Sequence, residues 1–383
     1  MTKVRDASFA LVANGFADGP AQAMRDYLVE EGAHRVVAVN HPLSAEEGSE
    51  HTLSEWADGQ LVRSERKRRP SRPPMSYPID LFTPFLLPKV DCWFGYNPLN
   101  VAHGIAARRL GRASRVVYWG VDFVDTRFGR GPLTSVYELS ERFACRRADA
   151  RFELSEAMRD ARNRRHGGER RPPLAPVRIV PMGAWIVHVP VSDPDAYRKR
   201  RIVYMGHLLP KQGLLQLLDA VRMVRDQGLP VELDLIGRGP QEGELRERAG
   251  RLGIEDAVRF HGFVDDHREL EKMVASGSIG AAPYATGSES SYTIYADPGK
   301  LKIYLAAGLP IITTDAAPVA AELGEAGAAA IVDFNPEAIA RAIERLLTDE
   351  AEWTRRRSAA LSLARKYDWE LILSGALRWL GFE

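Results

Sequence analysis

The stretch IVYMGHLLPKQGLLQLLDAVRMV, residues 202–224, decides the fold of this chain. Its first four residues are apolar, which predicts a short buried strand, and Gly206 ends that run. Apolar side chains then recur at helical spacing, at Leu214, Leu217, Leu218, Val221 and Val224. A strand that passes through a glycine loop into an amphipathic helix is the repeating unit of a parallel sheet covered by helices.

The same alternation extends in both directions. Downstream, strands are predicted at 231–236, 258–260, 279–282 and 310–313, with helices at 300–307 and after Asn335-Pro336. Upstream, strands at 9–13, 35–39, 90–96, 116–121 and 177–180 alternate with helices after Pro20, at 98–110 and at 133–148. Prolines and the basic run 198–201 separate the two series. The sequence therefore predicts an α/β protein with two doubly wound Rossmann-like domains, residues 1–187 and 188–365.

Composition narrows the class of protein. The chain has 383 residues, 45% hydrophobic and 27% charged, as in an ordinary globular enzyme. Its net charge is +1, with +7 over residues 1–200 and −6 over residues 201–383, so we expect two domains with different partners. Cys92 and Cys145 are too few for a disulfide framework or a four-cysteine zinc site. No run of roughly eighteen apolar residues and no leader pattern occurs, so we expect a cytoplasmic protein.

Loops after the downstream strands carry residues suited to a ligand, because open parallel sheets bind ligands at the carboxyl ends of their strands. Lys211 lies in the loop before a helix, where an ammonium and backbone N–H groups together favour a diphosphate. Gly237 and Gly262 follow the next two strands, where glycine lets a ligand approach the backbone. A further polar loop with Tyr292 and Asp297 precedes the helix at 300–307. Each loop taken singly also fits an ordinary turn.

Four runs in this order resemble the donor-nucleotide domain of the retaining GT-B glycosyltransferases, in particular family 4. The runs are YMGHLLPKQG (204–213), LIGRGP (235–240), FHGFV (260–264) and KLKIYLAAGLP (300–310). The resemblance covers about 201–370 and reaches the upstream half only in architecture. It implies two domains that face each other across a cleft, and a final helix, 366–383, that returns to the first domain. It also implies a nucleotide sugar as co-substrate, with no other cofactor.

The resemblance assigns site residues in the second domain. Lys211 would bind the donor diphosphate and act in catalysis, with Gly206 and His207 beside it. The nucleotide pocket would be lined by Gly237, Arg238, Phe263, Val264 and Tyr292.

The second domain departs from the family at two places. The family carries two glutamates eight positions apart, and Tyr295 and Ile303 stand there instead. Asp297 is the substitute that we predict for the ribose contact. His207 occupies the position of a family arginine, so one phosphate charge depends on its protonation or is supplied by Lys300.

In the first domain, Asp122 alone remains of the His-Asp pair that many family members carry. We predict that Asp122 acts in catalysis, where it would orient a sugar hydroxyl, help to deprotonate the acceptor or stabilise positive charge. Capping of its own loop is the alternative. Gly19 is expected to contact the donor, and Tyr96, Asn97 and His103 are predicted, from position alone, to line an acceptor pocket.

These observations predict transfer of a sugar from a nucleotide diphosphate donor to a small-molecule, glycan or lipid-linked acceptor, with retention of configuration. No metal is predicted, because Asp193 and Asp195 lie in the linker and the histidines lack ligand spacing. Two alternatives stay open. One is a nucleotide-sugar epimerase or a phosphorylase on the same fold, and the other is a non-catalytic nucleotide-sugar-binding protein.

Two basic stretches have several interpretations. We favour solvated loops, the first of them in a proline-containing segment. Contact with an anionic membrane face and binding of an anionic acceptor are the alternatives. Nucleic acid is not expected, because no aromatic interleaving or recognition motif accompanies the charges. The residues are Arg63, Arg66, Lys67, Arg68, Arg69 and Arg72, and Arg159, Arg162, Arg164, Arg165, Arg170 and Arg171.

Overall fold

The chain is divided into two compact units. A computed structural model describes residues 2–16, 18–43, 48–68, 82, 85, 87–124, 127, 129, 131–168, 172–287 and 293–383. Unit 1 comprises Met1–Pro181 and Glu370–Glu383, and unit 2 comprises Met182–Trp369. The chain therefore crosses between units at 181/182 and again at 369/370, a few residues from the predicted boundaries at 187 and 365.

Unit 1 is built on an eight-stranded sheet in the order β4-β3-β2-β1-β5-β6-β7-β8. The neighbouring strands in the series β2-β1-β5-β6-β7-β8 pair in parallel. Strand β3 pairs antiparallel with both β2 and β4. The bounds are β1 Ser8–Asn14, β2 Arg35–His41, β3 Glu50–Ala57, β4 Gln60–Arg68, β5 Val90–Gly95, β6 Ala113–Gly120, β7 Ala150–Glu153 and β8 Val177–Ile179.

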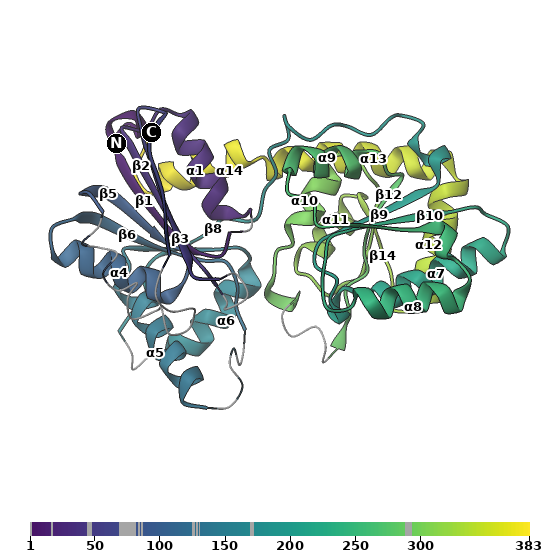
Figure 1. The fold of residues 1–383 in the computed structure, drawn as a ribbon, viewed down its shortest axis with the longest axis horizontal. Helices are drawn as coiled ribbons and strands as arrows, with labels where there is room; N and C mark the ends of the chain where they lie inside the picture. The colour runs from purple at the N-terminus through teal and green to yellow at the C-terminus, as the bar shows by residue number, and fades with distance from the viewer. Residues whose placement is uncertain are drawn as a thin grey trace. The chain divides into compact units, whose positions relative to one another are not determined.

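Helices cover both faces of this sheet. Helices α1 (Pro20–Glu30) and α14 (Trp369–Trp379) lie on one face, and α4 (Pro98–Arg109) and α5 (Pro132–Arg147) lie on the other (Figure 1). Helix α6 (Glu156–His166) follows β7. Beneath α14, the strands contribute an aromatic layer, and each ring buried there contributes about 1.5–3 kcal/mol of stability. The rings are Phe9, Phe94, Trp119 and Phe152, in contact with Phe382 and Trp379.

The β3–β4 hairpin corrects the sequence analysis, which expected parallel strands and placed the first basic stretch in a loop. Arg63, Arg66, Lys67 and Arg68 lie on β4, the edge strand, while Arg69 and Arg72 fall outside the described residues. An edge strand exposed on both faces has no apolar alternation to reveal it. The available signal was Asp58-Gly59, since both residues have positive φ, 48° and 79°, as a two-residue hairpin turn requires.

Unit 2 has a six-stranded parallel sheet in the order β11-β10-β9-β12-β13-β14. The strand order reverses between β9 and β12, the kind of point where open α/β sheets bind ligands. The bounds are β9 Arg201–Met205, β10 Glu232–Ile236, β11 Val258–Gly262, β12 Ile279–Ala282, β13 Ile311–Thr313 and β14 Ala329–Ile331.

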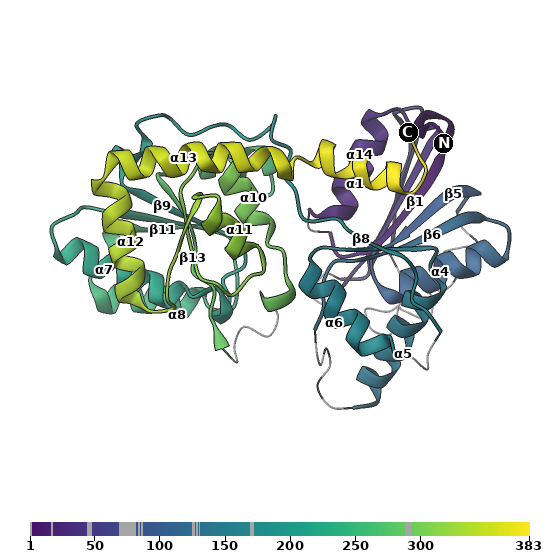
Figure 2. The same cartoon turned by 180° about the vertical axis from the view of Figure 1, so that it is seen from behind.

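The unit 2 sheet is also covered on both faces (Figure 2). One face packs against α7 (Leu214–Asp226), α8 (Glu242–Leu252) and α12 (Pro336–Thr348). The other packs against α9 (His267–Ala275), α10 (Gly299–Ala306), α11 (Val319–Glu325) and α13 (Glu350–Ala364). Helix α12 begins at the predicted Asn335-Pro336 pair, where the Asn335 side chain accepts a hydrogen bond from Ala338 N at 2.8 Å. The predicted α/β class with two sheet-and-helix units is confirmed.

Among the described residues, we find no helix whose length and hydropathy would let it cross a bilayer.

Candidate functional site

Glycines bring together the loops that follow β9, β10 and β11 in unit 2. Gly237 has φ +139°, and a Cβ atom there would lie 2.0 Å from the carbonyl oxygen of Gly206. Gly206 N donates to Ile236 O at 2.9 Å, and Gly237 N donates to Gly262 O at 2.8 Å. No side chain fits between loops in such close contact. The three loops therefore form one continuous backbone surface at the carboxyl edge of the sheet.

Lys211 is positioned by a second close approach. It lies in a 3-10 turn, Pro210–Gln212, that Gly213 ends in the left-handed conformation. A Cβ atom on Gly213 would lie 1.9 Å from Pro283 O, just beyond β12. Lys211 O accepts a hydrogen bond from Ala285 N at 2.9 Å. The loop is thus fixed against the end of β12, which neighbours β9 in the sheet.

Lys300, in the first turn of α10, reaches the same place. Its Nζ donates to Gln212 Oε1 at 2.8 Å and lies 4.0 Å from the Tyr204 ring centroid. A Cβ atom on Gly206 would lie 3.0 Å from Lys300 Nζ. The residue as a whole is half-buried, but its ammonium is enclosed between the ring of Tyr204, the amide of Gln212 and the bare backbone of Gly206.

The ammonium of Lys300 is enclosed and lies close enough to Lys211 to be affected by its charge. Burial, followed by the charge of Lys211, lowers the pKa of the Lys300 ammonium well below its ordinary value. In the described part of the chain, no carboxylate forms an ion pair with Lys300. A bound anion would supply the missing counter-charge and raise that pKa again. The arrangement is therefore suited to a phosphate group lying against Gly206.

Asp297, the predicted ribose contact, has a different environment. Its side chain is buried, with Oδ2 accepting from Met182 N at 2.8 Å and Oδ1 paired with the buried Lys302 ammonium. Lys302 Nζ also lies 4.6 Å from the Tyr367 ring centroid. Both carboxylate oxygens thus have internal partners, which favours a structural role for Asp297 over the predicted ribose contact. Ile303, at one of the family's glutamate positions, is 7% exposed and packs in the core.

The remaining residues of the predicted nucleotide pocket lie at this edge with their side chains exposed to different degrees. Phe263, at the end of β11, is 58% exposed, so its ring is accessible for stacking, whereas Val264 packs against the core. Arg238 is exposed and lies near Gly262, whose Cβ position is 3.6 Å from Arg238 Nε. His207 is exposed, and its carbonyl accepts from Tyr204 Oη at 2.7 Å. Tyr292 falls outside the described residues.

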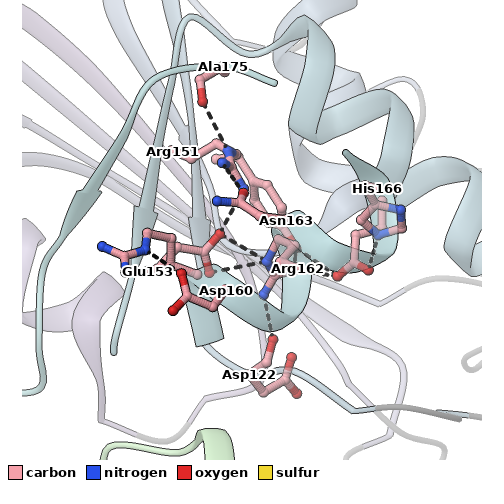
Figure 3. Close-up of polar contacts among 11 residues, drawn as sticks. Asp122, Arg151, Glu153, Asp160, Arg162, Asn163, His166 and Ala175 are labelled. Carbon is pink, nitrogen blue, oxygen red and sulfur yellow. Dashed lines mark hydrogen bonds and ion pairs between the residues drawn. The ribbon is translucent and has the colours of Figure 1, made fainter. Parts of the chain in front are cut away.

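In unit 1, Asp122 follows β6 and lies beside a buried charge network (Figure 3). Its carboxylate is exposed and pairs with Arg127. Its carbonyl accepts from Arg162 Nη2 at 2.8 Å, and two residues later Val124 O accepts from Arg165 Nη1 at 2.9 Å. Two arginines of α6 therefore hold the backbone of the Asp122 loop, while the Asp122 side chain remains at the surface.

Arg162 corrects a second expectation, because the sequence analysis favoured a solvated stretch there. Its side chain is fully buried, with Nε 2.9 Å from Glu153 Oε1 and Nη1 2.8 Å from Tyr118 Oη. It also pairs with the buried Glu141. A Cβ atom on Gly120 would lie 2.6 Å from Arg162 Nη2, so β6 needs glycine where the guanidinium passes. Arg170 and Arg171 lie outside the described residues.

The pKa values of the two carboxylates in this network are shifted in opposite directions. Burial opposes ionisation of Glu141, but Arg162 and His166 overcome it and lower its pKa to about 2. His166 Nε2 lies 2.6 Å from Glu141 Oε2. For Glu153, burial prevails over Arg162 and Arg151 and raises the pKa. The network thus stabilises the charge of Glu141 at the base of the Asp122 loop.

Asparagines join the neighbouring strand ends in unit 1. Asn97, predicted from its position, caps α4 by accepting from Asn100 N at 2.9 Å, and it also donates to Asn14 at the end of β1. Asn14 Oδ1 accepts from Asn100 Nδ2 at 2.9 Å, a contact that the sequence analysis did not foresee. Gly19 lies beyond the same strand and is the N-cap of α1. The asparagines therefore order the carboxyl edge around β1 and β5.

Tyr96 and His103 do not line an open surface, in contrast to their predicted role. Tyr96 is 5% exposed and stacks on Trp119 at 5.4 Å between centroids. His103 is 1% exposed, and burial lowers its pKa to about 4. Both side chains face the interior because their elements are buried on that side. Neither is available to an acceptor in this structure.

Known proteins resemble this chain in the sequence of residues 199–349 and in fold. Residues 199–349 match the family model described as glycosyl transferases group 1. The phosphatidyl-myo-inositol mannosyltransferase of Mycobacterium leprae is 30% identical over 181 residues, which cover 47% of this chain and 46% of that protein. The chain thus spans no more than about half the length of the curated relatives it matches.

Two solved structures extend the similarity to both units. Sucrose-phosphate synthase from Thermosynechococcus elongatus aligns with a TM-score of 0.68 at 16% identity over 98% of each chain. Anabaena Alr3699/HepE in complex with UDP-glucose aligns with a TM-score of 0.67 at 17% identity, covering 98% of this chain and 99% of that one.

The class of protein follows from the fold and the matched domain. The two α/β units are those of the GT-B fold, and residues 199–349 of unit 2 match the group 1 glycosyltransferase model. The chain resembles glycosyltransferase family 4, as its motifs predicted.

Proposed function

We propose that this chain is a glycosyltransferase that moves a sugar from a nucleotide diphosphate to an acceptor. The observation that carries the proposal is the ammonium of Lys300, which is enclosed against Gly206. This ammonium lies near Lys211 and forms no ion pair with a carboxylate of the described residues. A diphosphate provides the negative charge that this arrangement lacks. Similarity to Alr3699/HepE, whose structure holds UDP-glucose, supports a nucleotide sugar as the donor.

The same charges suit the chemical step. When the bond between sugar and diphosphate breaks, negative charge grows on the leaving phosphate and the sugar becomes oxocarbenium-like. Fixed cations and backbone N–H groups stabilise that charge without reorganisation. Gln212 and Tyr204 fix the ammonium of Lys300 in this sense, and the backbone of the Lys211 loop is fixed against the end of β12. We infer that the two lysines supply the positive charge of the transfer step without a metal, and that configuration is retained.

Asp122 is our candidate in unit 1. Its exposed carboxylate, paired with Arg127, stands on a loop that Arg162 and Arg165 hold by its backbone. We propose that it orients or deprotonates the acceptor hydroxyl. The acceptor class is a glycan or a lipid-linked molecule, for which the name of the mycobacterial relative gives support.

A donor screen tests the proposal. The full chain is incubated with UDP-, GDP- and ADP-sugars and a panel of sugar and lipid acceptors, and products are identified by mass spectrometry. We expect transfer from one donor, slow hydrolysis of that donor alone, and the same anomeric configuration by NMR in donor and product. Activity should persist in EDTA.

Variants separate catalysis from binding. Lys211→Met should lower turnover about 10²- to 10³-fold. Lys272→Met, an exposed lysine of α9 in the same unit, is the matched control and should leave turnover unchanged. Nucleotide binding without transfer or hydrolysis across the whole panel would favour a non-catalytic binding protein, and interconversion of free nucleotide sugars would identify an epimerase.

A further inference from the structure

Phe123 lies between Asp122 and Val124, and it contacts the same helix as its two neighbours. The residue is 4% exposed. The guanidinium carbon of Arg165 lies 4.2 Å from the centroid of its ring, and that of Arg162 lies 5.4 Å from it. A guanidinium over an aromatic ring is attracted to it, more strongly where water is excluded. Helix α6 therefore holds three consecutive loop residues, two by a carbonyl oxygen and one by its ring.

We call the two arginines, Arg162 and Arg165, the α6 clamp. They are three residues apart, so both side chains leave the same side of the helix. The carbonyl oxygens that they bind precede them by 40 and 41 residues, so tertiary contacts hold the loop 122–124. Figure 3 shows Arg162 reaching the backbone of Asp122 from the buried network. The carboxylate of Asp122 thus stands on a fixed backbone.

The carboxylate of Asp122 is oriented as well. It pairs with Arg127, whose guanidinium carbon lies 4.9 Å from the ring centroid of Tyr137 on α5. The Asp122 side chain is 53% exposed, whereas that of Arg127 is 23% exposed, so the carboxylate is accessible while its partner is mostly covered. A carboxylate fixed at its backbone and at its partner is preorganised to orient a bound hydroxyl.

The two members of the clamp differ in what else they hold. Arg162 pairs with the buried carboxylates of Glu141 and Glu153. Replacing it would remove a cation from both carboxylates and destabilise the fold. Arg165 is half-buried, so its replacement should cost less stability. Arg165 is therefore the member of the clamp through which the loop can be loosened in a folded protein.

We propose that Phe123 and Arg165 are positioning residues of the transfer reaction, and that they hold Asp122 where its carboxylate meets the acceptor hydroxyl. The inference rests on the proposed function, since it assigns the two residues to the acceptor step. Neither residue has to touch a substrate, because Phe123 is buried and Arg165 binds the backbone of Val124. A displacement of about 1 Å can lower turnover about 100-fold. Loosening the loop should therefore lower turnover and leave the lysine site of unit 2 unchanged.

Steady-state kinetics of Arg165→Met test the proposal in the full chain. Methionine keeps much of the side-chain length but loses the cation and the hydrogen bond to Val124 O. We expect turnover in transfer to fall about 10- to 100-fold, with the KM for the donor and the Kd for the nucleoside diphosphate within about twofold of wild type. Arg165→Lys, which keeps a cation and a donor, should recover part of the loss. Arg164→Met, at the exposed neighbour on α6, is the matched control and should behave as the wild type does.

Phe123→Leu tests the contribution of the ring. Leucine fills much of the same space but offers no aromatic face to the two guanidinium groups. Turnover in transfer should therefore fall about tenfold, again with unchanged nucleotide affinity.

A double-mutant cycle with Asp122→Asn shows whether the clamp acts through the carboxylate. In that background, Arg165→Met should lower turnover by less than about twofold, because the group that it positions has already been removed. A residue that only stabilises the fold would cause the same loss in both backgrounds.

Hydrogen exchange gives a readout that needs no substrate. Amide exchange over residues 121–124 should be about tenfold faster or more in Arg165→Met than in the wild type, and unchanged in Arg164→Met. Unchanged exchange in Arg165→Met would overturn the proposal, and so would an equal loss of turnover in the Asp122→Asn background. A wild type that neither transfers nor hydrolyses any donor would refute the proposed function and the acceptor role of the loop together. Wild-type transfer with an unaffected Arg165→Met variant would refute the positioning role alone.

Discussion

Replacement of Lys300 by methionine tests the central feature of the donor site. Methionine has nearly the same length and shape but no charge. In the ligand-free protein, the change removes an enclosed cation that lies near Lys211, together with its hydrogen bond to Gln212 and its contact with the Tyr204 ring. These effects oppose one another, so we expect the free energy of unfolding to change by less than about 1 kcal/mol.

Nucleotide binding should respond differently. A hydrogen bond between charged groups contributes about 1.5–3 kcal/mol, so loss of the Lys300 ammonium should weaken binding of the nucleoside diphosphate about 10- to 150-fold. At a nucleotide concentration of about 100 times the wild-type Kd, the wild type gains about 2.7 kcal/mol of stability. A variant that binds about 100-fold more weakly gains only about 0.4 kcal/mol at that concentration.

Thermal unfolding with and without nucleotide measures both quantities, and isothermal titration calorimetry gives the Kd directly. The control is Lys272→Met, which should keep the wild-type shift with nucleotide. If Lys300→Met retains wild-type affinity, the phosphate does not lie against Gly206. If the ligand-free variant is destabilised by several kcal/mol, Lys300 has a structural role and its enclosure says nothing about a ligand.

Three further predictions concern the same unit. Because the depressed pKa of Lys300 rises when the diphosphate binds, nucleotide binding should take up protons, and the affinity should fall as the pH rises above the pKa of Lys300 in the ligand-free protein. Calorimetry in buffers of different ionisation enthalpy measures the proton uptake. Binding without proton uptake would refute the assignment. Asp297→Asn should leave the Lys302 charge buried without its partner and lower the free energy of unfolding, measured with denaturant, by about 3–5 kcal/mol, with nucleotide affinity unchanged. Unchanged stability with weakened nucleotide affinity would instead support the ribose contact. Gly237→Ala places a Cβ atom 2.0 Å from Gly206 O at a residue with φ +139°. It should therefore lower the free energy of unfolding by at least about 1–3 kcal/mol and abolish the nucleotide-induced thermal shift. A wild-type thermal shift would show that the loop adapts.

The predicted elements that were found share one property, a buried side with a regular period. The run 202–224 contains β9 and α7, because strand and helix bury their apolar residues at different spacings and the sequence records both. The hairpin β3–β4 was missed because β4 is exposed along most of its length and carries charges in place of an alternating apolar side. Its Asp58-Gly59 turn was the remaining local signal.

The sequence by itself determined the fold class, the order of the glycine loops and the position of Lys211, because each depends on neighbours within a few residues. Only the tertiary structure decided which charges have partners. Lys300 meets Gln212 across 88 residues of chain, and Asp297 meets Met182 across 115. Arg162, which lies in a basic stretch, is buried against Glu141 and Glu153. The energy of a charge depends on its burial and its neighbours in space, and a local pattern contains neither.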